Sequence, residues 1–221
     1  MCLAAYKPKG VEIEKKYLRS GFYSNCSGCG FMYHDNGKLF VVKGLFSFNE
    51  FYEKVQAVGQ KEHDMAFHFR AASHGPVSDA NCHPYEMVDG KWAMLHNGIF
   101  SIRCKNPNLS DSGNYAHDVL EPAILNGTYK DKFSDGTFKL QRDNRWGWGA
   151  VVLMSAGGEV TIYNEDMGEW DNDIGAWFSN GAYRLCDYAG NSRYMDERDE
   201  ENYRCKPRPG YGCFAEGEWG E

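Results

Sequence analysis

The apolar residues of the chain gather in short runs, and most of these runs are continuous rather than alternating with polar positions. Such runs predict strands whose two faces are both covered by other parts of the protein. The Asn36-Gly37 pair between the second and third runs is typical of a tight hairpin turn, and 155–160 resembles another turn. The strands are expected at 2–6, 28–34, 38–46, 64–72, 91–100, 147–156, 159–164 and 176–180.

Three segments instead carry apolar residues at helical spacing: 11–22, 48–59 and 110–125. Ser47 and Gly59 supply a start and a stop for the second segment, and Pro122 is expected to bend or shorten the third. Helices interspersed among strands in this order suit antiparallel sheets covered by helices. The predicted fold class is therefore α+β.

Length and composition indicate one large folded domain, because the 221 residues include 42% hydrophobic and 15% aromatic residues. The character of the chain changes near residue 191, so we expect a domain over 1–190 and a tail over 191–221. The tail is charged, rich in proline and glycine, and poor in aliphatic residues. It is typical of a solvated segment, but its aromatic residues could pack on the domain or on a partner.

The net charge of −7 and the lack of a basic block argue against a nucleic-acid partner. No apolar run approaches the length of a membrane span, and the N-terminus lacks the layout of a secretion signal. We therefore expect a cytoplasmic protein whose eight cysteines are mostly reduced.

One cysteine pair has the spacing of metal ligands, namely Cys26 and Cys29 in the stretch NCSGCG. No second pair of this kind completes a zinc site, since Cys205 and Cys213 are too far apart in sequence. Two unrelated thiols are the simpler interpretation. We expect neither a metal nor another cofactor.

The polar residues with the most distinctive chemistry follow the ends of predicted strands. Arg70 ends one strand, and the planar guanidinium group of an arginine suits a carboxylate ligand. The alternative is a surface salt bridge, which most arginines form. Asn97 and Gly98 end another and could hold an oxyanion, or simply form a hairpin turn. Asp111 could bind an ammonium group, or simply cap a helix.

Cys2 is either an apolar residue of the first strand or a nucleophile that becomes N-terminal when Met1 is removed. An exposed α-amine has a pKa of about 8, so it can accept the thiol proton at neutral pH. A thiol, a carboxylate clamp, an acid for an ammonium group and an oxyanion hole together suit a glutamine-binding site.

These motifs resemble the class II (N-terminal cysteine) glutamine amidotransferases. RAASHGPVSDANCHPY and HNGI are similar to segments of the glutaminase domain of glucosamine-6-phosphate synthase, and small stand-alone bacterial and phage relatives look closer still. The likeness runs from Cys2 to about Asn180. It implies a four-layer αββα sandwich of two antiparallel sheets, the N-terminal-nucleophile hydrolase fold.

The resemblance also implies a role for each motif residue. Cys2 would attack the glutamine side-chain amide and form a thioester, while Asn97 and Gly98 hold the oxyanion. Arg70 would pair with the substrate carboxylate and Asp111 with its ammonium group. Ser73 and His74 would line the same pocket, and His83 would support it from the Asn-x-His-Pro turn. Water would then release glutamate.

The sequence departs from the family pattern at three positions. Ala71 replaces an aromatic residue, Ser73 replaces threonine, and Gly113 replaces glutamate, which would weaken the helix start behind Asp111. Substrate selectivity is the property most affected.

Three functions remain open at this point. The chain could be an amidotransferase that passes ammonia to a separate synthase subunit, with the tail as a docking element. It could be a stand-alone hydrolase of glutamine or of another γ-glutamyl amide. It could also be an inactive binding module that has kept the pocket.

Overall fold

A computed structural model describes residues 2–130 and 149–184. The strands of these residues form two sheets in which all paired strands are antiparallel. The six-stranded sheet has the order β3 (Lys38–Leu45), β2 (Cys29–Asp35), β4 (Met65–Phe69), β1 (Leu3–Lys7), β10 (Ala176–Phe178), β9 (Glu169–Asp171). The four-stranded sheet has the order β5 (Tyr85–Met87), β6 (Trp92–Asn97), β7 (Ala150–Ser155), β8 (Val160–Tyr163).

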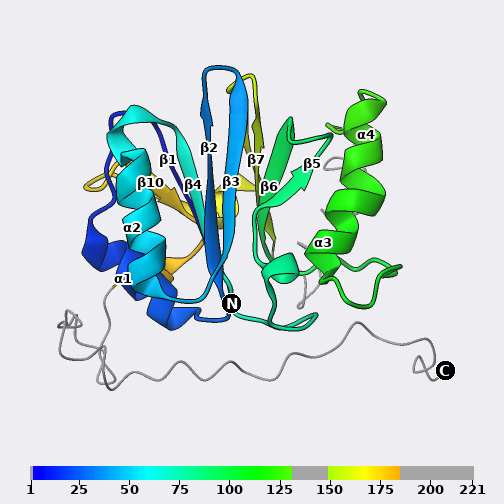
Figure 1. Cartoon of the computed structure of the whole chain (residues 1–221), viewed down its shortest axis with the longest axis horizontal. Helices are drawn as coiled ribbons and strands as arrows, with labels where there is room; N and C mark the ends of the chain where they lie inside the picture. Colours follow the sequence, from blue (N-terminus) through cyan, green and yellow to red (C-terminus); the bar gives the residue numbers. More distant parts are fainter. Residues whose placement is uncertain (1, 131–148, 185–221) are drawn as a thin grey trace.

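Helices cover the outer faces of both sheets, so the molecule has four layers (Figure 1). The helices α1 (Lys15–Ser24) and α2 (Phe48–Val58) lie on the six-stranded sheet, and α3 (Asp111–Tyr115) and α4 (Glu121–Leu125) lie beyond the four-stranded sheet. Short 3₁₀ turns occupy Gln60–Glu62, Asp79–Asn81, Glu165–Met167 and Gly181–Tyr183. The predicted αββα sandwich of the α+β class is confirmed.

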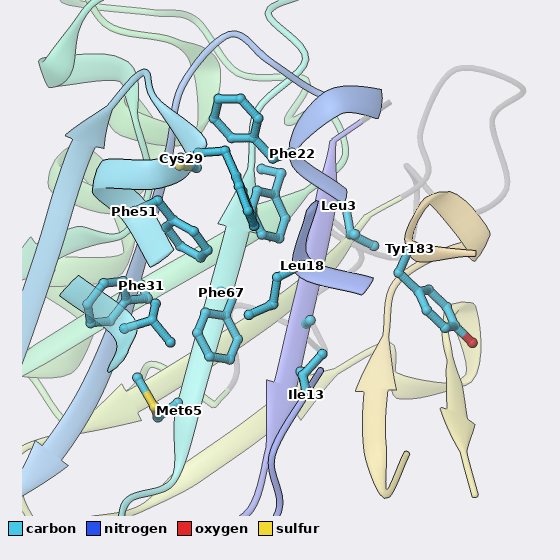
Figure 2. Packing of buried hydrophobic residues seen from close by; sticks show 14 of the residues in the cluster. Leu3, Ile13, Leu18, Phe22, Cys29, Phe31, Phe51, Met65, Phe67 and Tyr183 are labelled. Atoms are coloured by element: carbon cyan, nitrogen blue, oxygen red, sulfur yellow. The ribbon is translucent and has the colours of Figure 1, made fainter. Parts of the chain in front are cut away.

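Aromatic side chains fasten α1 and α2 to the six-stranded sheet (Figure 2). Phe51 of α2 meets Phe31 and Phe67 edge-on, with ring centroids 6.0 and 6.2 Å apart. In α1, Gly21 lies close to the first strand and its neighbour, because a Cβ there would lie 2.8 Å from Leu3 Cδ2 and 3.0 Å from the ring of Phe69. The packing therefore fixes the start of β1.

The opposite face of the six-stranded sheet packs against the four-stranded sheet. Ala4 and Ala66 are fully buried there in one cluster with Leu95 and Val152 of the second sheet. Side chains alternate along a strand, so His68 and Arg70 continue the row of Ala66 toward the second sheet. The continuous apolar runs reflect this double coverage.

The strand predictions agree with the structure apart from their ends, but two short strands were missed. These are β5 and β9, which are three residues long and too short to leave a pattern. The Asn36-Gly37 turn joins β2 to β3 as predicted, with both residues at positive φ. Helix α1 begins at Lys15 rather than at 11, and no side-chain hydrogen bond caps its N-terminus.

The helical segment expected at 110–125 contains a π-helical turn over Ala116–Leu120, between α3 and α4. Pro122 lies in the first turn of α4, directly after this π-helical turn. Residues 147–148 of one predicted strand, the boundary at 190 and the tail over 191–221 lie outside the described residues. No helix in the described part of the chain is long and apolar enough to cross a membrane.

Candidate active site

Cys2 and Arg70 lie at the same end of two neighbouring strands. β1 and β4 pair Leu3 with Phe69 and Ala4 with His68, so one more step in this register brings Cys2 opposite Arg70. Both follow the alternation that faces the second sheet. The backbone N–H of Ala71 donates to Cys2 Sγ over 3.3 Å, which confirms that the two segments meet.

The surroundings of the Cys2 thiol act on its pKa in opposite directions. Burial raises the pKa above its ordinary value, and this effect exceeds the lowering by the Ala71 N–H and by the positive charge of Arg70. The negative charge of Asp111 raises it further. The thiol is therefore protonated at neutral pH, and attack on a substrate requires a base.

Arg70 is only 3% exposed, so its interpretation as a surface salt bridge is wrong. Its guanidinium donates to three carbonyls of one loop, those of His74 (2.8 Å), Gly75 (3.3 Å) and Pro76 (2.9 Å). A guanidinium has five N–H donors in a rigid plane. Arg70 thus shapes the loop that follows β4 and places a buried positive charge close to Cys2.

Asn97 ends β6 and is fixed from the other sheet. Its Nδ2 donates to the hydroxyl oxygen of Ser179 over 2.8 Å. The Asn97-Gly98 pair does not form a hairpin turn, because β6 pairs with β5 and β7 while the chain continues from Gly98 toward α3. An amide at a strand end, followed by a backbone N–H, has the donors that an oxyanion requires.

Asp111 is the first residue of α3 and is almost completely buried. The interpretation of Asp111 as the helix cap is wrong, because Ser110 is the cap and its Oγ accepts from the Gly113 N–H over 3.2 Å. Asp111 Oδ2 instead accepts the Phe100 N–H over 2.6 Å. Burial raises the pKa of its carboxyl group, so a cationic ligand would stabilise the buried carboxylate.

Helix α3 begins at Asp111 despite the glycine at position 113. A Cβ at this position would lie 3.0 Å from the ring of Tyr85, whose hydroxyl contacts Ser110 Oγ at 2.7 Å. Glycine makes room for the aromatic ring that holds the capping serine. The helix start behind Asp111 is therefore supported from β5.

The other predicted site residues lie at different depths. His74 is half-buried. Ser73 is exposed and lies 3.3 Å from His74 Nδ1. Gly98 is half-buried directly after Asn97.

His83 lies in the interior, behind the residues just described. Its ring packs against those of His68 and Tyr85, with centroids 3.9 and 4.7 Å away. Both ring nitrogens are buried and have no hydrogen-bond partner among the described residues. Burial holds the pKa of His83 well below its ordinary range, so the ring is neutral.

Sequence reasoning missed the polar side chains that support this site. Asn81 Oδ1 accepts the Ser110 N–H over 2.7 Å, and Asn81 Nδ2 donates to the carbonyl of Asn108 over 2.8 Å. Ser179 and Asn180 hold Asn97 and Cys2, respectively. The available signals were the asparagine two residues before His83 and the polar pair that ends the last strand.

The described residues contain no group of three or more His, Cys, Asp or Glu placed to hold a metal ion. Cys29 is a buried strand residue whose thiol donates to the Leu45 carbonyl over 3.4 Å. Cys26 is disulfide-bonded, so the interpretation of Cys26 and Cys29 as two thiols is wrong for Cys26.

Comparison with known proteins relates the chain to one class of enzyme. It is 26% identical over 158 residues to the glutamine–fructose-6-phosphate aminotransferase (isomerizing) of Pyrococcus horikoshii, covering 66% of this chain and 26% of the relative. It is 37% identical over 75 residues to the protein of the same name from Corynebacterium diphtheriae, covering 30% of this chain and 12% of that relative. The chain thus spans about a quarter or less of the length of these relatives.

Among solved structures, glutamine phosphoribosylpyrophosphate amidotransferase from B. subtilis is similar in fold. Its TM-score is 0.50 at 16% identity, over 80% of this chain and 41% of that one. No family model matches the chain. The sequence relatives agree with the resemblance to the class II glutamine amidotransferases, and the fold matches the N-terminal-nucleophile hydrolase fold, as the motifs predicted.

Proposed function

We propose that this chain hydrolyses the side-chain amide of glutamine and releases ammonia, with Cys2 as an N-terminal nucleophile after removal of Met1. The observation that carries the proposal is the convergence of Cys2, Arg70 and Asp111. They come from three separate segments, and the charges of Arg70 and Asp111 both act on the Cys2 thiol. A buried cation and a buried anion beside one thiol suit a zwitterionic amino acid.

In the proposed reaction, Cys2 Sγ attacks the amide carbon while its proton passes to the free α-amine of the same residue. Asn97 Nδ2 and the Gly98 N–H stabilise the oxyanion. The amine then returns the proton to the leaving nitrogen, the carbon–nitrogen bond breaks, and ammonia departs. Water adds to the thioester, the carbon–sulfur bond breaks, and glutamate and the thiol are released.

Substrate binding is assigned to the charged groups around the thiol. Arg70 would pair with the α-carboxylate and Asp111 with the α-ammonium group. The positive charge of the ammonium group would stabilise the Asp111 carboxylate and so offset the rise in pKa that burial causes. Ser73 and His74 would line the pocket, and His83 would support it from the interior. The ammonia acceptor would be bound by a partner such as a separate synthase subunit, and the proposed compartment is the cytoplasm.

The test is the release of glutamate and ammonia from glutamine by the purified chain, compared with the Cys2→Ala variant and with a Cys104→Ser control. We expect activity in the wild type and in the control, and a loss of at least about 10³-fold in Cys2→Ala. Equal activity in wild type and Cys2→Ala would contradict the proposal. Hydrolysis of other γ-glutamyl amides but not of glutamine would assign the alternative, a stand-alone γ-glutamyl hydrolase.

A further inference from the structure

The end of β10 carries two polar residues, Ser179 and Asn180, that touch both halves of the candidate site. Both lie in the last stretch that the family resemblance covers, but the resemblance assigned no role to either residue. Ser179 is 7% exposed and follows Phe178, which pairs with Ala5 of β1. The pair therefore lies beside the strand that carries Cys2.

Ser179 Oγ accepts two hydrogen bonds from different sheets. The Ala4 N–H of the six-stranded sheet donates over 2.9 Å, and Asn97 Nδ2 of the four-stranded sheet donates over 2.8 Å. The Ser179 N–H in turn donates to the Ala4 carbonyl over 2.9 Å. One serine thus ties the nucleophile strand to the proposed oxyanion-binding asparagine.

This bond has a directional consequence for Asn97. A carboxamide is planar, and its two Nδ2–H bonds lie about 120° apart in that plane. When Ser179 accepts one of them, the direction of the other is set. A fixed donor stabilises a developing oxyanion without reorganisation, whereas a freely rotating amide must first be ordered.

Asn180 acts on the nucleophile itself. Its Nδ2 donates to the Cys2 carbonyl over 2.7 Å, and its Oδ1 accepts the Ala182 N–H over 3.0 Å. The amide is therefore held at both ends. Backbone groups two residues apart in a strand point to the same side, so the Cys2 nitrogen faces this edge, as the Ala4 N–H does.

We propose that Ser179 and Asn180 are positioning residues for the reaction, Ser179 through Asn97 and Asn180 through Cys2. The inference rests on the proposed glutamine hydrolysis and adds to it the device that fixes oxyanion donor and nucleophile relative to each other. Because β10 lies far along the chain from both, this device depends on the folded sandwich.

The kinetic test compares Ser179→Ala and Ser179→Thr with Ser155→Ala. Ser155 is a matched control, because it is also 7% exposed and its Oγ accepts a backbone N–H, that of Glu159 over 3.1 Å. It lies at the end of β7 that is farther from Asn97. In Ser179→Ala we expect kcat to fall about 10- to 100-fold with KM within threefold, a part of the loss typical of removing an oxyanion donor. Ser179→Thr keeps kcat within about fivefold, and Ser155→Ala within about twofold.

Asn180 is tested with two variants that separate its two hydrogen bonds. Asn180→Asp keeps the acceptor for Ala182 but loses the donor to Cys2, and Asn180→Ala loses both. A positioning role predicts that both variants lower kcat at least about 10-fold. Wild-type kcat in Asn180→Asp would show that only the turn at Ala182 matters, and would overturn the role of Asn180.

A second measurement decides the role of Ser179 without activity. The side-chain amide NMR signal of Asn97, assigned by its loss in Asn97→Asp, should move in Ser179→Ala and stay in place in Ser155→Ala. An unmoved signal, or a kcat for Ser179→Ala equal to that of Ser155→Ala, overturns the inference. A wild type that hydrolyses no glutamine but shows the NMR shift contradicts only the proposed function.

Discussion

The Ala71 N–H donates to Cys2 Sγ over 3.3 Å, which fixes the thiol against the loop that follows β4. The contact uses the backbone, so it is independent of the side chain at position 71. A small residue therefore replaces the family's aromatic one without loss of this contact. The position of Cys2 follows from strand register, while the space around its thiol depends on side chains such as that of Ala71.

Replacing Asn97 by alanine should lower kcat for glutamine hydrolysis about 10²- to 10³-fold and leave KM within about threefold. The physical reason is that, in the proposed reaction, Asn97 Nδ2 would bind the substrate oxygen more strongly once negative charge develops on that oxygen. Steady-state kinetics on glutamine measure both constants. A rise in KM at unchanged kcat would assign Asn97 to ground-state binding instead.

Replacing Arg70 by lysine should destabilise the protein and raise KM for glutamine. Lysine cannot reach the carbonyls of His74, Gly75 and Pro76 together, so we expect a loss of about 2 kcal/mol in the free energy of unfolding. Denaturant unfolding measures this loss. Arg184→Lys is the control, because Arg184 pairs with Glu169 at the surface and should change stability by less than about 0.5 kcal/mol. Equal effects of the two substitutions would contradict the role of Arg70.

The buried histidines should make the protein sensitive to acid. Burial lowers the pKa of His68 and of His96 from 6.5 to about 3. Between these values the unfolded state binds protons that the folded state excludes. Stability is therefore fully present above pH 6.5 and is lost as the pH falls, by about 1.4 kcal/mol per pH unit for each histidine.

Denaturant unfolding at pH 7.5, 6.5 and 5.5 tests this prediction about the histidines. His68→Gln keeps a donor for the His96 carbonyl and should reduce the pH dependence, whereas His117→Gln, at an exposed site, should not. The raised pKa of Asp111 acts in the opposite direction, since acid relieves its buried charge. A free energy of unfolding that stays constant down to pH 5.5 would contradict the claim that these histidines are buried and neutral in the folded protein.

Replacing Gly113 by alanine should destabilise the protein, although alanine favours helices by about 1 kcal/mol. The new Cβ would meet the ring of Tyr85 at 3.0 Å, and that ring is buried and held by Ser110. We expect a net loss of about 1 kcal/mol in the free energy of unfolding. Gly157→Ala is the control, since its Cβ would meet only Ser155 at 3.6 Å. A stabilised Gly113→Ala protein would show that Tyr85 can move.

The sequence allowed the fold class and most strands to be predicted, because the continuous apolar runs correspond to strands buried on both faces. The ends of elements were less predictable. The helix at α1 lacks a capping side chain, and β5 and β9 are too short for a periodic signal. Tertiary pairing, rather than local preference, defines these elements.

The candidate site was predictable where a motif carried it and not where the fold assembled it. Cys2 stood out because it follows Met1, and Asn97 and Asp111 stood out because they lie at a predicted strand end and a predicted helix start. Ser179 and Asn180 did not, since nothing local distinguishes a polar pair after a strand from an ordinary turn. Their contacts with Asn97 and Cys2 arise only when β10 pairs with β1.

The most direct test of the account is mass spectrometry of the N-terminal peptide, with and without a glutamine-like diazo-ketone that alkylates nucleophilic thiols. The account predicts a peptide that begins at Cys2 and carries one adduct on its sulfur, with labelling suppressed by glutamine. A peptide that retains Met1 and carries no adduct would contradict the account, because the α-amine would be unavailable as the base.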